Sequence, residues 1–156
     1  MSIEAVRKYF VEFGMEGRIQ EFETSSATVT LAAEELYCEE ERIAKTLAFQ
    51  KDEEVILIVV AGDRKIDNRK FKNSFQKRAR MVAFDEVQKA VGHASGGVCP
   101  FAVNEGVKIY LDTSLQKFVT VFPACGSSNS AIELTIDELA RYANSLAWVD
   151  VCKEDE

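Results

Sequence analysis

The chain has 156 residues, 47% of them hydrophobic and 29% charged, with a formal net charge of −7. This composition excludes a disordered chain, and the length fits one domain spanning residues 1–156. No apolar run approaches the roughly 18–20 residues of a membrane span, and the N-terminus lacks the basic and apolar regions of a signal peptide. We therefore expect a cytoplasmic protein with no membrane partner.

Hydrophobic periodicity predicts helices and strands in alternation along the first half of the chain. Val6, Phe10 and Phe13 fall at helical spacing. Gly14 is expected to end that helix. The apolar run Val55–Val60 is typical of a buried strand. The expected elements are a helix over 2–13, a strand over 18–24, a helix over 31–37, and strands over 43–49 and 55–60 joined by a turn at 51–52.

The second half of the chain also combines predicted helices and strands, so the sequence predicts a mixed α/β fold. Asp85 is expected to cap a short helix, and Thr135 with Glu138 forms the pattern of a capping box. Asp112 is expected to form the turn between two strands. The expected elements are helices over 67–75, 85–92 and 136–145, and strands over 79–82, 107–111, 118–122, 132–134 and 147–151.

Cysteine and histidine usage gives no signature of a metal site. The four cysteines, at positions 38, 99, 125 and 152, include no CxxC pair, and His93 is the only histidine. Zinc sites usually show recognisable ligand spacings. We expect reduced thiols in a reducing compartment and no bound metal.

The charge is unevenly distributed along this acidic chain. The segment Arg64–Arg80 holds eight basic residues and one acidic residue, Asp67. Phosphate contacts supply much of the affinity for nucleic acids, and a local basic patch can make them on an acidic protein. A charge run is more often a solvated helix face, so both interpretations stay open.

Three segments carry residues suited to catalysis or ligand binding. Lys45 interrupts an apolar strand, where an ammonium is costly unless paired; alternatively, it is an edge lysine that points to water. The loop Gly96-Gly97-Val98-Cys99-Pro100 can turn its N–H groups towards an anion, or it is a plain tight turn. The segment Cys125–Ser130 is rich in small polar residues, which predicts either a polar pocket or a solvent loop.

A cysteine nucleophile is a further alternative. Cys99 lies in the glycine loop, and His93 precedes it by six residues. A thiol in contact with an imidazole can be activated for attack on a carbonyl. The sequence does not place the two side chains in contact, and a structural or surface histidine is the more common case.

Taken in order, these segments resemble the bacterial YbaK/ProX-like domain, which is related to the editing insertion of prolyl-tRNA synthetase. The matching features are the lysine strand Ile43–Leu47, the GxxxP loop Gly96–Pro100, Asp112 after a strand, and the closing Ala131–Thr135 with its helix. The match covers nearly the whole chain. Family members that deacylate Cys-tRNA(Pro) tend to have an aspartate where this chain has Ala131, so the amino-acid specificity is open.

The resemblance implies a curled mixed sheet flanked by helices, no metal or cofactor, and hydrolysis of the ester between a wrong amino acid and tRNA. The implied partner is the tRNA acceptor end, with an aminoacyl-tRNA synthetase as a second candidate. The expected catalytic residues are Lys45, Gly96, Gly97, Val98 and Cys99. The expected substrate-binding residues are Pro100, Asp112, Gly126, Ser127, Ser128, Asn129 and Ser130. The expected tRNA contacts, from the basic segment, are Lys70, Lys72, Lys77 and Arg78.

This chemistry is plausible because an aminoacyl ester is already activated, so the attacking water needs orientation more than a strong base. The amides of Gly96–Cys99 are expected to stabilise the oxyanion that forms on the carbonyl. Lys45 is expected to bind the terminal phosphate or to orient the ester. The main alternative is a non-catalytic module that binds an amino acid or aminoacyl-tRNA on the same fold.

Overall fold

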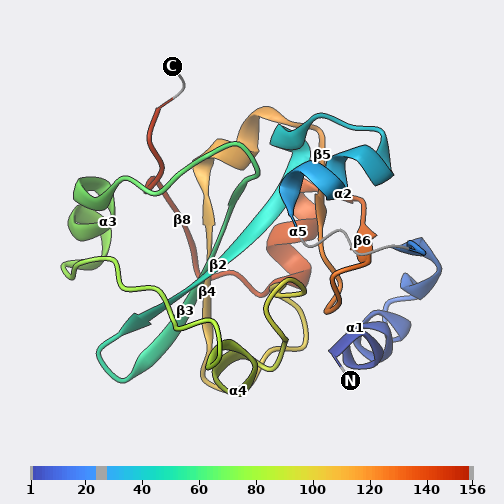
Figure 1. The fold of residues 1–156 in the computed structure, drawn as a ribbon, viewed down its shortest axis with the longest axis horizontal. Helices are drawn as coiled ribbons and strands as arrows, with labels where there is room; N and C mark the ends of the chain where they lie inside the picture. Colours follow the sequence, from blue (N-terminus) through green and yellow to red (C-terminus); the bar gives the residue numbers. More distant parts are fainter. Residues whose placement is uncertain (1, 24–27, 155–156) are drawn as a thin grey trace.

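A long antiparallel hairpin lies at the centre of the fold (Figure 1). The computed structural model describes residues 2–23 and 28–154. Strands β2 (Ile43–Lys51) and β3 (Glu54–Ala61) pair over eight residue pairs. β3 consists largely of Val, Ile and Leu, which favour extended structure on a buried sheet. This hairpin confirms the two strands and the turn predicted there.

Four more strands extend the hairpin into a curled mixed sheet. On one side, β4 (Lys108–Asp112) lies parallel to β3, and β8 (Ala147–Val149) lies parallel to β4. On the other side, β5 (Thr120–Pro123) lies parallel to β2, and β7 (Leu134–Thr135) lies antiparallel to β5. The strand order β7-β5-β2-β3-β4-β8 confirms the expected mixed sheet.

Helices cover both faces of this sheet. One core is closed by α1 (Ser2–Val11), α4 (Val87–Val91) and α5 (Ile136–Tyr142). A second core is closed by α3 (Asn68–Phe75), which lies on the opposite side of the hairpin (Figure 1). Because β3 is buried on both faces, its apolar residues need not alternate with polar ones.

A third, smaller core covers the edge beside β5. It joins α2 (Val29–Leu36) to β6 (Ser130–Ile132), which forms a separate antiparallel pair with β1 (Ile19–Glu21). Thr28 caps α2, because its side-chain oxygen accepts from the N–H of Leu31 at 3.2 Å. This arrangement places α2 beside the start of β2.

Side-chain caps fix two other helices, one of them by the capping box that the sequence predicted. Asp67 accepts from the N–H groups of Arg69 and Lys70 at the start of α3. Thr135 and Glu138 form the expected capping box of α5. Two short 3-10 helices precede strands, η1 (Glu16–Arg18) before β1 and η2 (Glu40–Arg42) before β2.

Three expectations are wrong, and in the first two distant parts of the chain decide the structure. The strands on either side of Asp112 do not form a hairpin, because the 3-10 helix η3 (Thr113–Lys117) separates them and they pair on opposite sides of the central hairpin. The strand expected over 79–82 is reduced to a single bridge between Phe49 and Met81. Asp85 does not cap α4, whose N-cap residue is Glu86.

Element ends also differ from the prediction. Helices α1 and α5 end two to three residues early, at Val11 and Tyr142, and β8 ends at Val149. The strand expected over 132–134 is divided between β6 and β7, which lie in different sheets. Strand β1 is shorter than expected, and Thr24, at the end of the predicted range, lies outside the described residues. Every helix in residues 2–23 and 28–154 is too short or too polar to traverse a bilayer.

Candidate functional site

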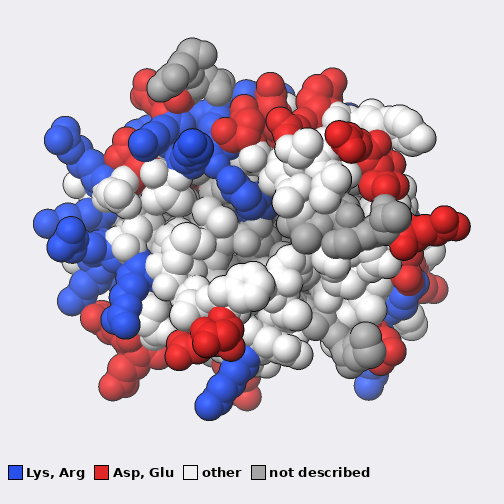
Figure 2. All heavy atoms as spheres, viewed as in Figure 1, with Lys and Arg blue, Asp and Glu red and all other residues white. Residues whose placement is uncertain are grey.

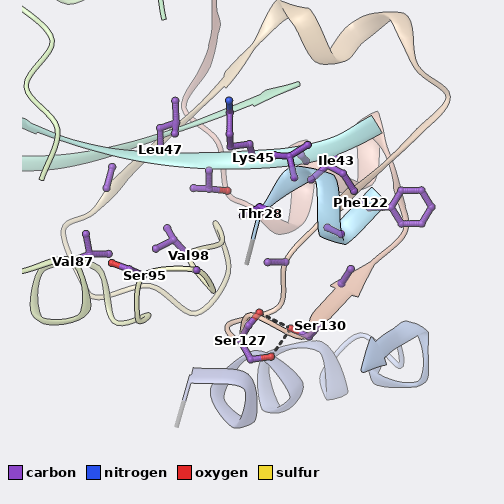
Figure 3. A pocket seen from close by; sticks show the side chains of 18 of the residues that line it. Thr28, Ile43, Lys45, Leu47, Val87, Ser95, Val98, Phe122, Ser127 and Ser130 are labelled. Atoms are coloured by element: carbon purple, nitrogen blue, oxygen red, sulfur yellow. Dashed lines mark hydrogen bonds between the residues drawn. The ribbon is translucent and has the colours of Figure 1, made fainter. Parts of the chain in front are cut away.

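A cavity of about 390 Å³ opens at the edge of β2, between α2 and the glycine loop (Figure 3). Most of its lining is apolar, and a few polar groups converge on it, which is the usual composition of a small-molecule site. Its walls come from α2, the first half of β2, the segment 81–87, and two of the loops that the sequence singled out. Its polar and loop residues are Thr28, Thr46, Ser95, Gly96, Val98, Ser127 and Ser130.

One wall of the cavity is a stretch of β2 whose outer edge carries no partner strand. β5 pairs with β2 as far as Ala44. Further along, the N–H of Val82 donates to the carbonyl of Ala48 at 3.0 Å. In the part of the chain that the structure describes, no strand pairs with the edge at Thr46. Because alternate residues of a strand direct their backbone groups to the same side, the N–H and C=O of Thr46 point into this gap.

Thr46 is a cavity residue that sequence analysis missed. Its Oγ1 is buried and has no hydrogen-bond partner among the described residues. A buried hydroxyl without a partner costs about 1–3 kcal/mol, so a bound molecule or water that reached this oxygen would recover that cost. The signal was present in the sequence, because a side chain next to Lys45 in a strand must point to the opposite face.

Lys45 borders the cavity, but its ammonium lies on the other side of β2, away from Ser127 and Val98 (Figure 3). Its Nζ donates to the carbonyl of Arg64 at 2.8 Å. Across the hairpin it lies opposite Val60, which belongs to the core beneath α3. Burial lowers the pKa of the Lys45 ammonium. The charge of Lys45 is therefore placed beside the basic segment and not beside the glycine loop.

The glycine loop contributes two of its residues to the cavity lining. Gly96, with φ of +92°, and Val98 line it, whereas Gly97 and Cys99 are buried behind it. The N–H of Gly97 donates to the carbonyl of Ala94 at 3.0 Å and is thus already used. Among the amides expected to form an anion cradle, those of Gly96 and Val98 remain candidates.

Gly97 has a packing role that the sequence analysis did not predict. A Cβ at this position would lie 2.7 Å from the backbone nitrogen of Ser127 and 2.8 Å from the carbonyl carbon of Gly126. Side chains do not tolerate such distances to backbone atoms. The glycine loop and the polar loop 125–130 therefore touch backbone to backbone, which fixes their relative position at the cavity.

Cys99 and His93 are in contact, as the nucleophile alternative required, but their environment makes them inert. The Sγ of Cys99 lies 3.5 Å from Nε2 of His93, and that nitrogen lies 2.6 Å from the carbonyl of Phe101, to which it donates. Burial raises the pKa of the Cys99 thiol to about 12 and lowers the pKa of His93. A neutral thiol sealed behind the loop is not an activated nucleophile. Within residues 2–23 and 28–154, no three His, Cys, Asp or Glu side chains group as metal ligands.

Ser127 and Ser130 of the polar loop 125–130 line the end of the cavity opposite β2 (Figure 3). The Oγ of Ser127 donates to the Oγ of Ser130 at 2.8 Å. The Oγ of Ser130 in turn accepts from the N–H of Cys125 at 3.2 Å. These bonds hold two hydroxyl groups in fixed positions at the cavity wall.

Five of the expected substrate contacts lie outside the lining of this cavity, and two of them make hydrogen bonds within the fold. The carboxylate of Asp112, at the end of β4, accepts from the N–H groups of Val151 and Ser114 at 2.8 and 2.9 Å. Asn129 donates through Nδ2 to the carbonyl of Phe22 at 2.9 Å. The other three are Pro100, Gly126 and Ser128.

The wall formed by α2 and its neighbours is apolar. Val29, Ala32 and Leu36 project from α2 into the lining, together with Phe122 of β5. Ala131 also lines the cavity and is buried. Where the resembling family has an aspartate, this chain thus has an uncharged wall.

The basic segment lies on one side of the molecule. Figure 2 shows Lys and Arg side chains gathered over α3, while Asp and Glu side chains gather over α2. Lys70 donates to Asp150 at 3.2 Å, and Lys77 lies 3.3 Å from a carboxylate oxygen of Asp52. Lys72 is exposed, as is Arg78. Two of the four expected RNA contacts are therefore engaged by acids of the protein, and two extend into solvent.

Comparison with known proteins shows the family of this chain. The model of the aminoacyl-tRNA editing domain matches residues 23–142. The chain belongs to the aminoacyl-tRNA editing domain family. The uncharacterized protein YwhH of Bacillus subtilis (strain 168) is 52% identical over 157 residues, which cover 100% of both chains. The proline–tRNA ligase of Halalkalibacterium halodurans is 31% identical over 104 residues, or 66% of this chain and 18% of the ligase.

Solved structures of this domain have the same fold. A protein proposed to be a trans-editing enzyme for prolyl tRNA synthetase superposes with a TM-score of 0.88 at 25% identity, over 98% of both chains. The hypothetical protein APE2540 superposes with a TM-score of 0.80 at 26% identity, over 92% of this chain and 99% of its own. These matches confirm both the family and the mixed α/β fold that the sequence predicted.

Proposed function

We propose that the protein is a trans-acting aminoacyl-tRNA deacylase that hydrolyses the ester of a mischarged tRNA in the cytoplasm, with residues 1–156 acting as one editing domain. The observation that carries this proposal is the cavity between the open edge of β2 and the glycine loop, in a chain of the editing-domain family. The similarity to a protein proposed to be a trans-editing enzyme, over 98% of both chains, supports the trans-acting role.

The reaction adds water across the ester. The water oxygen bonds to the carbonyl carbon, the bond to the ribose oxygen breaks, and the proton of the water ends on that ribose oxygen, which releases the amino acid and the tRNA. Negative charge develops on the carbonyl oxygen before the bond breaks. The amides of Gly96 and Val98 are the donors proposed to stabilise it, since both residues line the cavity.

Thr46 is proposed to position the reacting groups. Its buried hydroxyl can accept from or donate to the attacking water, and its backbone carbonyl, on the open edge of β2, can accept from the α-ammonium of the amino acid. Water that is held in this way needs no strong base, because the ester is already activated.

The lining favours a small uncharged amino-acid side chain. Apolar residues of α2 and β5 would desolvate a charge, and Ala131 supplies no carboxylate to pair with a cation. The hydroxyl groups of Ser127 and Ser130 are the polar contacts available at that wall. We therefore propose alanyl, seryl, cysteinyl or threonyl esters as the substrates.

The acceptor stem of the tRNA is proposed to lie against the basic side of the molecule. Lys72 and Arg78 extend into solvent there and can contact phosphates directly. Lys70 and Lys77 can do so only by leaving Asp150 and Asp52. An aminoacyl-tRNA synthetase that hands over the charged tRNA is proposed as a second partner.

The test is hydrolysis of a panel of alanyl, cysteinyl, seryl and threonyl esters on several tRNAs by the purified protein. Turnover of at least one ester is expected. Thr46→Val keeps the shape and removes the hydroxyl, so it should slow hydrolysis by about 2- to 10-fold, the value of one hydrogen bond. Thr113→Val, at an exposed threonine outside this cavity, is the matched control. Tight binding of charged tRNA with no turnover would establish the non-catalytic module instead.

A further inference from the structure

The mouth of the cavity carries an exposed aromatic ring that the proposed chemistry does not use. Phe84 lines the cavity and is 82% exposed, which makes it the most exposed phenylalanine in the described residues. Met81, 60% exposed, lines the same mouth. Leaving both side chains in water forfeits the free energy that burial would give, so their position beside a cavity indicates a surface for a ligand.

The backbone that carries this ring is held in place. The Oγ of Ser95 donates to the carbonyl of Phe84 at 2.9 Å, and the N–H of Val82 donates to the carbonyl of Ala48 at 3.0 Å. Ser95 directly precedes Gly96, so one hydrogen bond ties the backbone of Phe84 to the segment that carries the proposed oxyanion donors. The backbone of Phe84 therefore has a fixed place relative to the proposed site of hydrolysis.

Charge on the same segment indicates what the ring contacts. Arg78 and Arg80 precede it, and both are exposed. The carbonyl of Arg80 accepts from the N–H of Gln50 at 2.8 Å, which fixes this part of the backbone too. Two guanidinium groups followed by an aromatic ring form the combination that binds single-stranded nucleic acid, with phosphates on the cations and a base on the ring. Asp85 and Glu86, on the other side of Phe84, would repel a phosphate, so the backbone of the RNA is directed towards Arg80.

We propose that Phe84 is the stacking platform for the terminal adenine of the tRNA, with Arg80 and Arg78 on the phosphates that precede it. The inference rests on the proposed function and names the positioning residue for its substrate. The ester and the adenine are attached to the same ribose. A base stacked at the mouth therefore places the ester inside the cavity, towards Gly96 and Thr46.

The first test is the affinity of the full-length protein for an uncharged RNA hairpin that has an acceptor stem and a CCA end. Base stacking on an aromatic residue corresponds to a loss of about 5- to 150-fold in affinity when that residue becomes alanine, so Phe84→Ala should weaken binding by this factor. Phe84→Trp, which keeps an aromatic ring at this position, should retain the wild-type affinity. Tyr37→Ala removes an aromatic ring that is 97% exposed and lies outside this cavity, and it should leave the affinity unchanged.

The second test removes the base instead of the ring. A hairpin whose terminal nucleotide is abasic should bind wild-type protein as weakly as Phe84→Ala binds the intact hairpin, and combining the two changes should cost no more than either alone. The proposal would be overturned if the two losses in affinity were additive. It would also be overturned if Phe84→Ala left the affinity for the hairpin unchanged and instead weakened binding of a protein partner. Thermal unfolding of each variant confirms that it is folded.

Hydrolysis measurements separate this inference from the proposed function. If the protein turns over an aminoacyl-tRNA, Phe84→Ala should raise KM and leave kcat nearly unchanged. Turnover with an unchanged KM in Phe84→Ala would leave the deacylase intact and overturn the stacking role. Loss of adenine-dependent binding in Phe84→Ala, in a protein that hydrolyses none of the esters, would support the stacking role and overturn the deacylase.

Discussion

Lys45 is the residue whose observed position most changes its expected role. Its ammonium donates to the carbonyl of Arg64, on the side of β2 away from the glycine loop. We predict that Lys45→Met, which keeps the length of the side chain, raises KM for aminoacyl-tRNA and leaves kcat nearly unchanged, because the lost charge lies away from the proposed site of the ester and can act only on RNA phosphate. Steady-state kinetics with Lys45→Arg as the control decide this. A fall in kcat with constant KM would show that Lys45 acts in the chemical step, as the sequence analysis expected.

Cys99 yields a prediction about thiol chemistry, which the proposed mechanism does not use. Burial raises the pKa of its thiol to about 12, and its Sγ lies behind the loop against His93. Cys99→Ala should therefore retain most of the hydrolytic activity and lose about 1 kcal/mol of stability, the cost of a small buried cavity. Hydrolysis rates and urea unfolding measure both. Inactivity of a folded Cys99→Ala protein would establish a thiol mechanism.

At the scale of elements, the glycine loop and the polar loop form one unit. A Cβ on Gly97 would lie 2.7 Å from the backbone of Ser127. Gly97→Ala should force the loops apart, destabilise the protein by about 1–3 kcal/mol and reduce hydrolysis. Gly17→Ala is the matched control, because a Cβ there meets nothing within 4 Å. Equal melting temperatures for the two variants would contradict the backbone contact between the loops.

The elements themselves were predictable wherever the information was local. The continuous apolar run of β3, the helix that begins after Asp67, and the capping box of Thr135 and Glu138 each depend on a few neighbouring residues, and all three are confirmed. The hairpin expected around Asp112 failed because β4 and β5 take their partners from β3 and β2, far away in the sequence. Pairing over such distances leaves no local pattern.

The candidate site was predictable in part for the same reason. Gly96, Val98, Ser127 and Ser130 lie in loops whose composition stands out, and all four line the cavity. The open edge of β2 at Thr46 depends on where β5 ends and the segment 80–82 begins, which the sequence does not show. The wall contributed by α2 also depends on tertiary packing alone.

At the scale of the whole molecule, stability should fall in two steps as the pH is lowered. Burial lowers the pKa of His93 from its ordinary 6.5, and the hydrogen bond from Arg18 lowers the pKa of Glu138 from 4.5 to about 2. In both cases the unfolded chain binds the proton more readily, so the free energy of unfolding decreases as the pH falls. The loss due to His93 begins as the pH falls below 6.5, and the loss due to Glu138 extends from about 4.5 to 2.

Two variants separate these steps in urea unfolding measured across the pH range. His93→Gln should flatten only the upper step, and Arg18→Gln, which removes the partner of Glu138, should flatten only the lower one. Unchanged profiles in both variants would assign the acid sensitivity to other groups.

The separation of charge across the molecule leads to the last prediction. Lys and Arg side chains gather over α3 on a protein of net charge −7, so RNA phosphates should be attracted to that side and repelled elsewhere. Lys72→Gln and Arg78→Gln should each flatten the log–log dependence of tRNA affinity on salt concentration by about 0.7–0.9. The identity of the amino acid removed should not change, because phosphate contacts position the RNA without reading the side chain. Lys8→Gln, an exposed lysine on α1, is the control and should leave the slope as it is. If the double variant at Lys72 and Arg78 keeps the wild-type slope, the acceptor stem does not lie against α3.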